Sequence, residues 1–154
     1  MSEPAVTIEN ASPRAIASIA VRLPVSRVPA VFGGYLDQVY ALGKSGAIAL
    51  DGQNIFVYRD TGTAGEADVE FGVGVKAPFA PIGAVRFTAL PTGDVATATH
   101  WGSYATLGDT HHAILAWCRA NGRVTTGTRW EVYGHMAGPN DRPRTDVCYQ
   151  LRAR

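Results

Sequence analysis

Cysteine is scarce in this sequence. Its two thiols, Cys118 and Cys148, are thirty residues apart on the chain, and neither belongs to a Cys-x-x-Cys pair. Such a pattern indicates neither a structural zinc site nor a disulfide scaffold. We therefore expect both residues to be buried free thiols.

Excess charge and long hydrophobic runs are also missing. Fourteen basic and thirteen acidic residues leave a formal net charge of +1, so nothing predicts attraction to nucleic-acid phosphates or to an anionic membrane. The N-terminal stretch MSEPAVTIENASPRAIA has no basic region followed by an apolar core, and no stretch approaches the length needed to span a bilayer. We expect a cytoplasmic protein that contacts no membrane and binds no nucleic acid directly.

What is present is an ordinary globular balance. The 154 residues are 46% hydrophobic and 18% charged, which suits one well-covered domain. Residues 1–13 are polar and contain proline, so we expect a flexible lead-in there. The single domain would then occupy residues 14–154.

The pattern of residues 14–80 predicts strand, helix, strand, strand. Residues 15–23, AIASIAVRL, look like a strand that Pro24 closes, and the segment from Val28 to about Gly43 has apolar residues at helical spacing. A Gly-rich turn then joins two further strands, NIFVYRD and DVEFGVGVKAP.

Residues 84–152 repeat that order. The strands GAVRFTALP and GDVATATH precede a helix, and RWEVYGHM and TDVCYQLR follow it. The helix carries one stripe of residues, namely Leu107, His111, Ile114 and Cys118. We therefore predict an α+β fold of duplicated β-α-β-β units, with an antiparallel sheet of about eight strands, two helices and a central cleft between the repeats. That cleft is the natural place for a ligand.

Glu131 is the main candidate for chemistry. Alternation along RWEVYGH places Glu131, Tyr133 and His135 on one face of a strand, and Phe56 and Tyr58 correspond to them in the other repeat. We expect this face to point away from the helices. Aromatic rings around one carboxylate suit a cationic ligand, and burial among rings can also keep a carboxyl group protonated as a proton donor.

The segment TATHWGSY predicts a joint between a strand and a helix. Gly102 allows the turn, and Ser103 is a good N-cap. A Ser-His-acid triad is disfavoured because the Gly-x-Ser-x-Gly elbow is missing. Trp101 and Tyr104 remain candidates to wall the cleft, with core packing as the alternative. The expected ligand-binding residues are thus Phe56, Tyr58, Trp101, Tyr104, Glu131 and Tyr133.

Histidines give no metal or haem signal. His111 and His112 are adjacent on the expected helix and so point in different directions. His111 shares the apolar stripe and is expected to be a satisfied core histidine. His100 and His135 have no Asp or Cys at ligand spacing. We expect no metal site and no cofactor.

The order of short motifs resembles the GyrI-like effector-binding domain, which is also the ligand-sensing half of AraC-type and MerR-type regulators. The match covers roughly residues 14–152, and it rests on Pro91, Gly93, His100, Gly102, Tyr104, Trp117, Asn121, Gly122, Glu131, Val132, Tyr133, Asp146 and Val147. The resemblance implies a pseudo-twofold domain that holds a small organic ligand. Because no helix-turn-helix is apparent, it resembles the stand-alone branch, and regulation of DNA would need a regulator as partner.

Three functions follow from the resemblance. One is binding of a hydrophobic small molecule, either cationic or neutral, for sensing or detoxification. Another is hydrolysis of strained, cyclopropane-containing natural products, with Glu131 and Tyr133 as catalytic residues and Tyr58 as an alternative to Tyr133. The last is modulation of gyrase. Stand-alone members often carry a second acid where this chain has Cys148, whereas Glu70 occupies the equivalent place in the first repeat. That departure favours binding.

Overall fold

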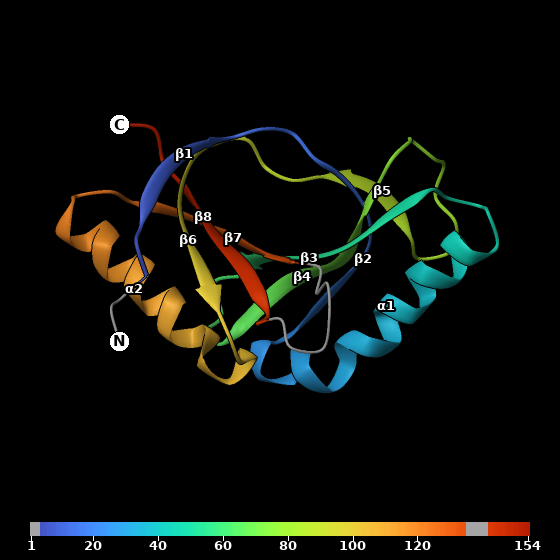
Figure 1. Cartoon of the computed structure of the whole chain (residues 1–154), viewed down its shortest axis with the longest axis horizontal. Coiled ribbons are helices and arrows are strands. Elements are labelled where there is room, and N and C mark those ends of the chain that lie inside the picture. Colours follow the sequence, from blue (N-terminus) through green and yellow to red (C-terminus); the bar gives the residue numbers. More distant parts are fainter. Residues whose placement is uncertain (1–3, 135–141) are drawn as a thin grey trace. The chain divides into compact units, whose positions relative to one another are not determined.

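The computed structural model describes residues 4–134 and 142–154. They form eight strands, paired antiparallel, and two α-helices, so the predicted α+β class is confirmed (Figure 1). The chain divides into two compact units. The middle unit comprises Pro13–Leu90, and the terminal unit comprises Met1–Ser12 with Pro91–Arg154.

The middle unit is a four-stranded antiparallel sheet with one helix. Its strands lie in the order β3-β4-β2-β5. The elements are β2 (Ala15–Pro24), the 3-10 turn η1 (Val25–Arg27), α1 (Val28–Lys44), β3 (Leu50–Asp60), β4 (Glu66–Val75) and β5 (Arg86–Ala89).

Aromatic rings form the core between α1 and this sheet. The Tyr35 ring of α1 stacks on the fully buried Phe71, with centroids 5.1 Å apart. The Phe56 ring meets Phe71 edge-on at 5.2 Å. Such geometries add to the area that the rings remove from water. The helical spacing predicted for α1 is thus explained by a packed face that also buries Leu36 and Val39.

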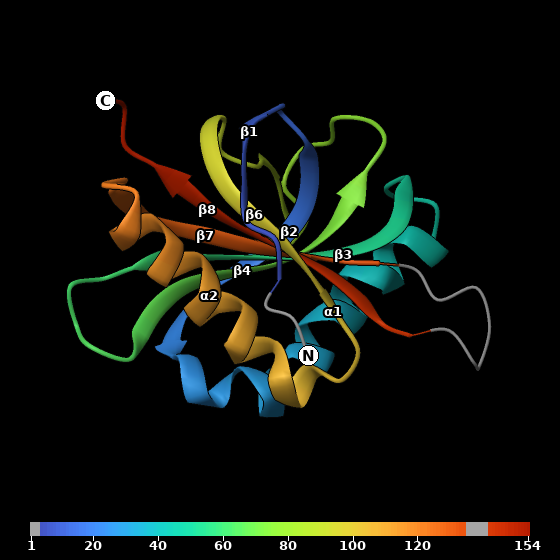
Figure 2. The same cartoon turned by 60° about the vertical axis from the view of Figure 1, so that its left-hand side comes forward.

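The terminal unit has the same plan. Its strands lie in the order β1-β6-β8-β7, and α2 packs on β6 and β8 (Figures 1 and 2). Its elements are β1 (Thr7–Ala11), β6 (Gly93–Trp101), the 3-10 turn η2 (Tyr104–Thr106), α2 (Leu107–Ala120), β7 (Thr125–Tyr133) and β8 (Arg144–Leu151). Its core is formed by Ala96, Ala98, Ile114, Cys118, Val147, Tyr149 and Leu151.

Two edge strands lie outside the boundaries that were predicted for the lead-in and for the second repeat. Residues 1–13 are not all a loose lead-in, because Thr7–Ala11 form β1, which pairs with β6. The strand Arg86–Ala89, expected to open the second repeat, pairs instead with β2 as β5. Each edge strand therefore joins the sheet of the other repeat. Ladder hydrogen bonds hold β1 although four of its five side chains are exposed, so it carries no apolar alternation that a sequence pattern could reveal.

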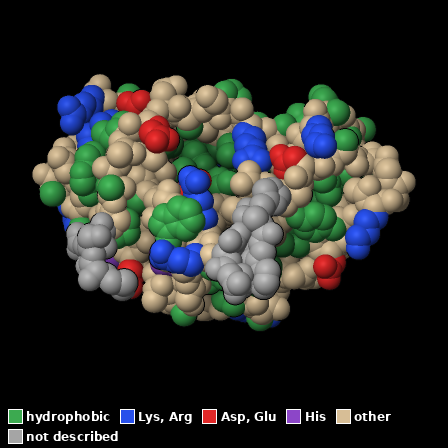
Figure 3. Space-filling model, viewed as in Figure 1, with side chains coloured by type: hydrophobic (Ala, Val, Ile, Leu, Met, Phe, Trp, Pro, Cys, Tyr) green, Lys and Arg blue, Asp and Glu red, His purple; other side chains and the backbone are tan. Residues whose placement is uncertain are grey.

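The described surface is mixed. On the face in Figure 3, basic side chains lie among acidic, neutral and hydrophobic ones. Within residues 4–134 and 142–154, no helix has the length and apolar character required to cross a membrane. The two thiols are free: Cys118 is buried and Cys148 is half-buried.

The joint between β6 and η2 behaves as predicted. Gly102 has a φ of +105°, which side-chain-bearing residues rarely adopt. Ser103 is the N-cap of η2, and its hydroxyl accepts from the Ala105 N–H at 3.1 Å. The segment that raised the possibility of a triad is therefore a capped turn.

Gly102→Ala should lower the free energy of unfolding by about 1 to 3 kcal/mol, because alanine is strained at this φ. The matched control is Gly108→Ala in α2, where an added Cβ meets nothing within 4 Å. That change should raise stability by roughly 0.5 to 1 kcal/mol. Urea denaturation measures both. Equal effects of the two substitutions would contradict the assigned backbone conformation.

Candidate functional site

A buried carboxylate lies between β7 and α2. Glu131 of β7 is 5% exposed, and both of its oxygens accept hydrogen bonds. The Tyr133 hydroxyl donates to Oε1 at 2.6 Å. The His111 ring of α2 contacts Oε2 through Nε2 at 2.7 Å. Hydrogen bonds of this kind favour the ionised form of a buried carboxylate.

Tyr149 of β8 holds the other side of the imidazole. Its hydroxyl lies 2.6 Å from His111 Nδ1, and the two rings meet edge-on with centroids 5.5 Å apart. Each ring nitrogen of His111 is thus in hydrogen-bond contact with one partner, Nδ1 with Tyr149 and Nε2 with Glu131. We call Glu131, His111, Tyr133 and Tyr149 the Glu131 cluster.

Strand alternation and register bring these side chains together. Glu131 and Tyr133 are two residues apart on β7, so they share a face. Glu131 pairs with Val147 of β8, which puts Tyr149 on the same face one pair further along. On α2, His111 is four residues after Leu107 and three before Ile114, and so lies on the face that packs on the sheet.

An exposed tyrosine borders the cluster. Tyr104 belongs to η2, and its ring meets Tyr133 edge-on at 5.8 Å. Tyr104 is 55% exposed, whereas Tyr133 is half-buried and Glu131 is buried. The rings therefore lead from the surface toward a carboxylate that is largely removed from water. These contacts bring Tyr104, Tyr133 and Glu131 together, and their role in binding a ligand stays a prediction.

The prediction that Glu131 and Phe56 face away from the helices was wrong. Glu131 contacts His111 of α2, and the Phe56 ring centroid lies 5.8 Å from that of Phe32 in α1. Both side chains therefore lie on the helix-bearing faces of their sheets. Tyr58 follows Phe56 by two residues and is also buried. Alternation shows which residues share a face of a strand, but not which face a helix covers. His135 lies outside the described residues.

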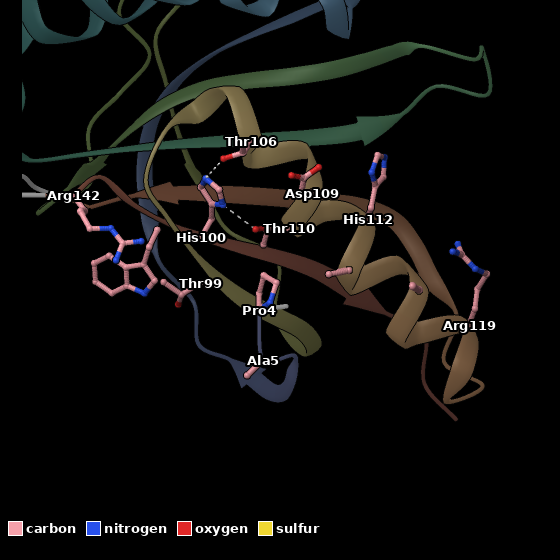
Figure 4. A pocket seen from close by; sticks show the side chains of 13 residues that line it. Pro4, Ala5, Thr99, His100, Thr106, Asp109, Thr110, His112, Arg119 and Arg142 are labelled. Carbon is pink, nitrogen blue, oxygen red and sulfur yellow. Dashed lines mark hydrogen bonds between the residues drawn. The ribbon is translucent and has the colours of Figure 1, made fainter. Parts of the chain in front are cut away.

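Trp101 lies in a different environment. It is 51% exposed, and its ring centroid is 6.0 Å from the Arg142 guanidinium and 5.6 Å from that of Arg144. It borders an open groove beside α2 (Figure 4). The other residues of the groove include Pro4, His100, Asp109, His112 and Arg119.

His100 in this groove is structural. Its Nδ1 lies 2.9 Å from the Thr110 hydroxyl and its Nε2 lies 2.8 Å from the Ser103 carbonyl oxygen (Figure 4 shows the Thr110 contact). Both ring nitrogens are thus used to fasten β6 to η2 and α2. The buried polar side chains of this groove, His100 and Thr110, are already paired with each other, so we take the Glu131 cluster as the candidate site.

The first repeat has its own buried carboxylate. Glu70 is 8% exposed and accepts from the Ser18 and Thr88 hydroxyls at 3.0 and 2.8 Å, and it forms an ion pair with Arg59. By alternation it lies on the face of β4 opposite Phe71. Arg59 already balances its charge, so Glu70 is bound within the middle unit.

Cys148 stands at the equivalent place in the second repeat. Its thiol contacts the Thr97 hydroxyl at 3.4 Å, and burial raises its pKa to about 11. At neutral pH this thiol is protonated and unreactive. It supplies no second acid beside Glu131.

The sequence analysis did not identify His111 and Tyr149 as members of the site, although the sequence pattern around each residue indicated its position. His111 interrupts an apolar stripe on α2, and Tyr149 alternates with Val147 on a strand that neighbours Glu131. His112 is exposed and points elsewhere, as expected for adjacent helical residues. Among the side chains that the structure describes, no three His, Cys, Asp or Glu residues gather as metal ligands do.

Solved structures share this fold across nearly the whole chain. The C-terminal domain of EcmrR has a TM-score of 0.74 and 19% identity, and the match covers 97% of this chain and 98% of that one. SAV2435 bound to tetraphenylphosphonium has a TM-score of 0.67 and 9% identity, with 97% and 94% covered. A hydrolase from Listeria innocua has a TM-score of 0.60 and 12% identity, with 97% and 93% covered.

At these identities the solved structures establish the fold. Comparison with curated protein sequences gave no match. The family model described as the GyrI-like small molecule binding domain matches residues 4–152, which include both units and the Glu131 cluster. The chain therefore belongs to the family of GyrI-like small-molecule-binding domains.

Proposed function

We propose that the chain binds a hydrophobic cationic small molecule over Glu131, for sensing or detoxification. The observation that carries the proposal is a carboxylate only 5% exposed, bonded to His111 and Tyr133, beside the exposed ring of Tyr104. The Glu131 carboxylate gives the site a negative charge when it is ionised. Tyr133 and Tyr104 provide rings whose faces attract a cation.

The Glu131 carboxylate attracts a bound cation more strongly than an exposed carboxylate would, because water is mostly excluded around it. At an effective dielectric constant near 20, two unit charges about 4 Å apart attract by about 4 kcal/mol, against about 1 kcal/mol in water. A hydrophobic cation also gives up little hydration when it leaves water. The site therefore selects for positive charge and apolar surface together.

The structural relatives support this chemistry without establishing it. The solved structure of SAV2435 contains tetraphenylphosphonium, a cation surrounded by aryl groups. EcmrR is also known in a complex with DNA, and there the match covers 57% of the EcmrR chain. By analogy, Phe56 and Tyr58 stay predicted ligand contacts, and a regulator or gyrase stays a predicted protein partner.

Glu131→Gln should weaken tetraphenylphosphonium binding by roughly 10- to 100-fold, because the amide keeps the shape of the carboxyl group and removes its charge. Isothermal titration calorimetry at pH 7.5 measures the affinity. Thermal unfolding of the variant, followed by circular dichroism, shows whether the fold is kept.

The control variant is Asp109→Asn, which removes one negative charge from the exposed side of α2. It should bind the cation as the unchanged chain does. Because Asp109 borders the groove beside Trp101, loss of binding in this variant alone would move the site to that groove. Equal binding by the Glu131→Gln variant and the unchanged chain would refute the proposed role of the carboxylate.

A second function is favoured by the hydrogen-bond chain behind Glu131. The contacts from Tyr149 to His111 and from His111 to Glu131 are 2.6 and 2.7 Å long, so a proton taken up by the carboxylate has a route to a second base. Such an arrangement suits hydrolysis of strained cyclopropane-containing compounds. Glu131 would give a proton to the substrate or take one from it, and the Tyr133 hydroxyl would stabilise the charge that develops on the substrate.

Under this second hypothesis, incubation with a cyclopropane-bearing cytotoxin should give the ring-opened, hydrated product. Mass spectrometry detects it as a gain of one water. Glu131→Gln should abolish product formation, whereas Asp109→Asn should preserve it. Recovery of unchanged compound after prolonged incubation with the unchanged chain would exclude this class of substrate and leave the binding function in place.

A further inference from the structure

We propose that the groove beside α2 is a second ligand site, which binds a small molecule that carries a carboxylate or sulfonate on a flat aromatic ring. The inference goes beyond the proposed function, because it concerns other residues of the terminal unit and a ligand of opposite charge. It starts from Arg142, an exposed arginine whose guanidinium lies over the ring of Trp101.

The groove is large enough for such a molecule. Its volume is about 1080 Å³, at the upper end of the range found for small-molecule sites. It is lined by residues of β6 and α2 and by Pro4 and Ala5, which precede β1 (Figure 4). Ala113 and Ala116 of α2 add small apolar side chains, so the lining includes surface on which a planar ring can pack.

Trp101 orients two arginine side chains beside the groove. Trp101 is 51% exposed, and its ring centroid lies 6.0 Å from the Arg142 guanidinium carbon and 5.6 Å from that of Arg144. The flat face of a guanidinium packs on an aromatic ring, whereas its N–H donors point outward in the plane of the group. Stacking on Trp101 therefore leaves these donors available for other partners.

The two arginines differ in their acidic partners. Arg144 forms an ion pair with Asp146, with N···O distances of 3.2 and 3.4 Å. Asp146 also accepts from the Thr99 hydroxyl at 2.8 Å, so this pair is tied to β6. Among the residues that the structure describes, no acidic side chain pairs with Arg142. Arg142 therefore offers an oriented set of donors to an anion that enters the groove.

The distribution of charge along the groove also favours an anion. Figure 4 shows Arg142 at one end of the groove and Arg119 at the other. Asp109 is the only acidic side chain among the described residues that line it. The arginines thus outnumber the acidic residue. This balance is the reverse of the Glu131 cluster, where the ligand meets a carboxylate, so the two sites select ligands of opposite charge.

The aromatic ring of the ligand is as important as its charge. A small inorganic anion would meet Arg142 in open water, where one ion pair contributes little. A ring attached to the anion adds contact with Trp101 and with the alanines of α2, and it excludes water from the ion pair. The groove therefore selects flat aromatic anions over inorganic ones.

Isothermal titration calorimetry with 2-naphthoate at pH 7.5 tests this site. Two comparison compounds separate the contributions of ring and charge. 2-Naphthamide has the same ring without the charge, and acetate has the charge without the ring. Each should bind the unchanged chain at least roughly 10-fold more weakly than 2-naphthoate does.

Arg142→Gln should weaken 2-naphthoate binding by roughly 10-fold or more, because glutamine keeps a polar side chain but loses the charge and the paired donors. Trp101→Leu, at an exposed position, should also weaken it, by roughly 3- to 10-fold. The control variant is Arg152→Gln, which removes an exposed positive charge near the C-terminus, outside the groove. It should bind 2-naphthoate as the unchanged chain does.

Nuclear magnetic resonance locates the bound anion. The indole ¹H–¹⁵N signal of Trp101 should move with saturation, whereas that of Trp130, which is 3% exposed, should stay in place. Failure of 2-naphthoate to bind, equal binding of 2-naphthamide, equal weakening by Arg142→Gln and Arg152→Gln, or an unmoved Trp101 signal each overturns the site. None of these measurements uses a cation, so failure here leaves the proposed cation site standing, and failure of cation binding leaves this site standing.

Discussion

The site depends on one constraint: a negative charge kept away from water. A carboxylate buried to this extent loses most of its hydration, and the loss must be offset by hydrogen bonds. Tyr133 and His111 supply those bonds, one to each oxygen. Tyr149 in turn fixes the imidazole. These hydrogen bonds offset part of the hydration that the carboxylate loses.

Strand register and helix packing in the terminal unit position the side chains of the Glu131 cluster. The β7–β8 register sets Glu131 and Tyr149 on one face, and α2 lays His111 across that face. The entry to α2 is fixed by Gly102 and by the Ser103 cap, which also bring Tyr104 against Tyr133. The other buried carboxylate, Glu70, has different partners: it forms an ion pair with Arg59 and accepts from the Ser18 and Thr88 hydroxyls.

Much of this arrangement follows from local sequence rules. Helical spacing predicted α1 and α2, strand-like segments predicted β2, β3, β4, β6, β7 and β8, and alternation predicted the shared face of Glu131 and Tyr133. Local sequence rules do not show which edge strand pairs with the sheet of the other repeat. The polar β1 and the short β5 owe their places to ladder hydrogen bonds with β6 and β2, which are set by distant partners.

The same limit applied to the site. The helix-bearing face of the sheet could not be read from alternation, and so the prediction for Glu131 and Phe56 was wrong. His111 was interpreted as a core histidine because it lies on an apolar stripe. It does face the core, but there it meets a carboxylate and a phenol, a meeting that depends on the packing of α2 against β7 and β8.

The central claim is that the Glu131 carboxylate receives a cation. The most direct measurement is the ¹³C chemical shift of the Glu131 side-chain carboxyl carbon during titration with tetraphenylphosphonium at pH 7.5, with Glu70 as an internal reference. The account predicts a saturable change at Glu131 and none at Glu70. A Glu131 signal that does not move while the cation binds would contradict it.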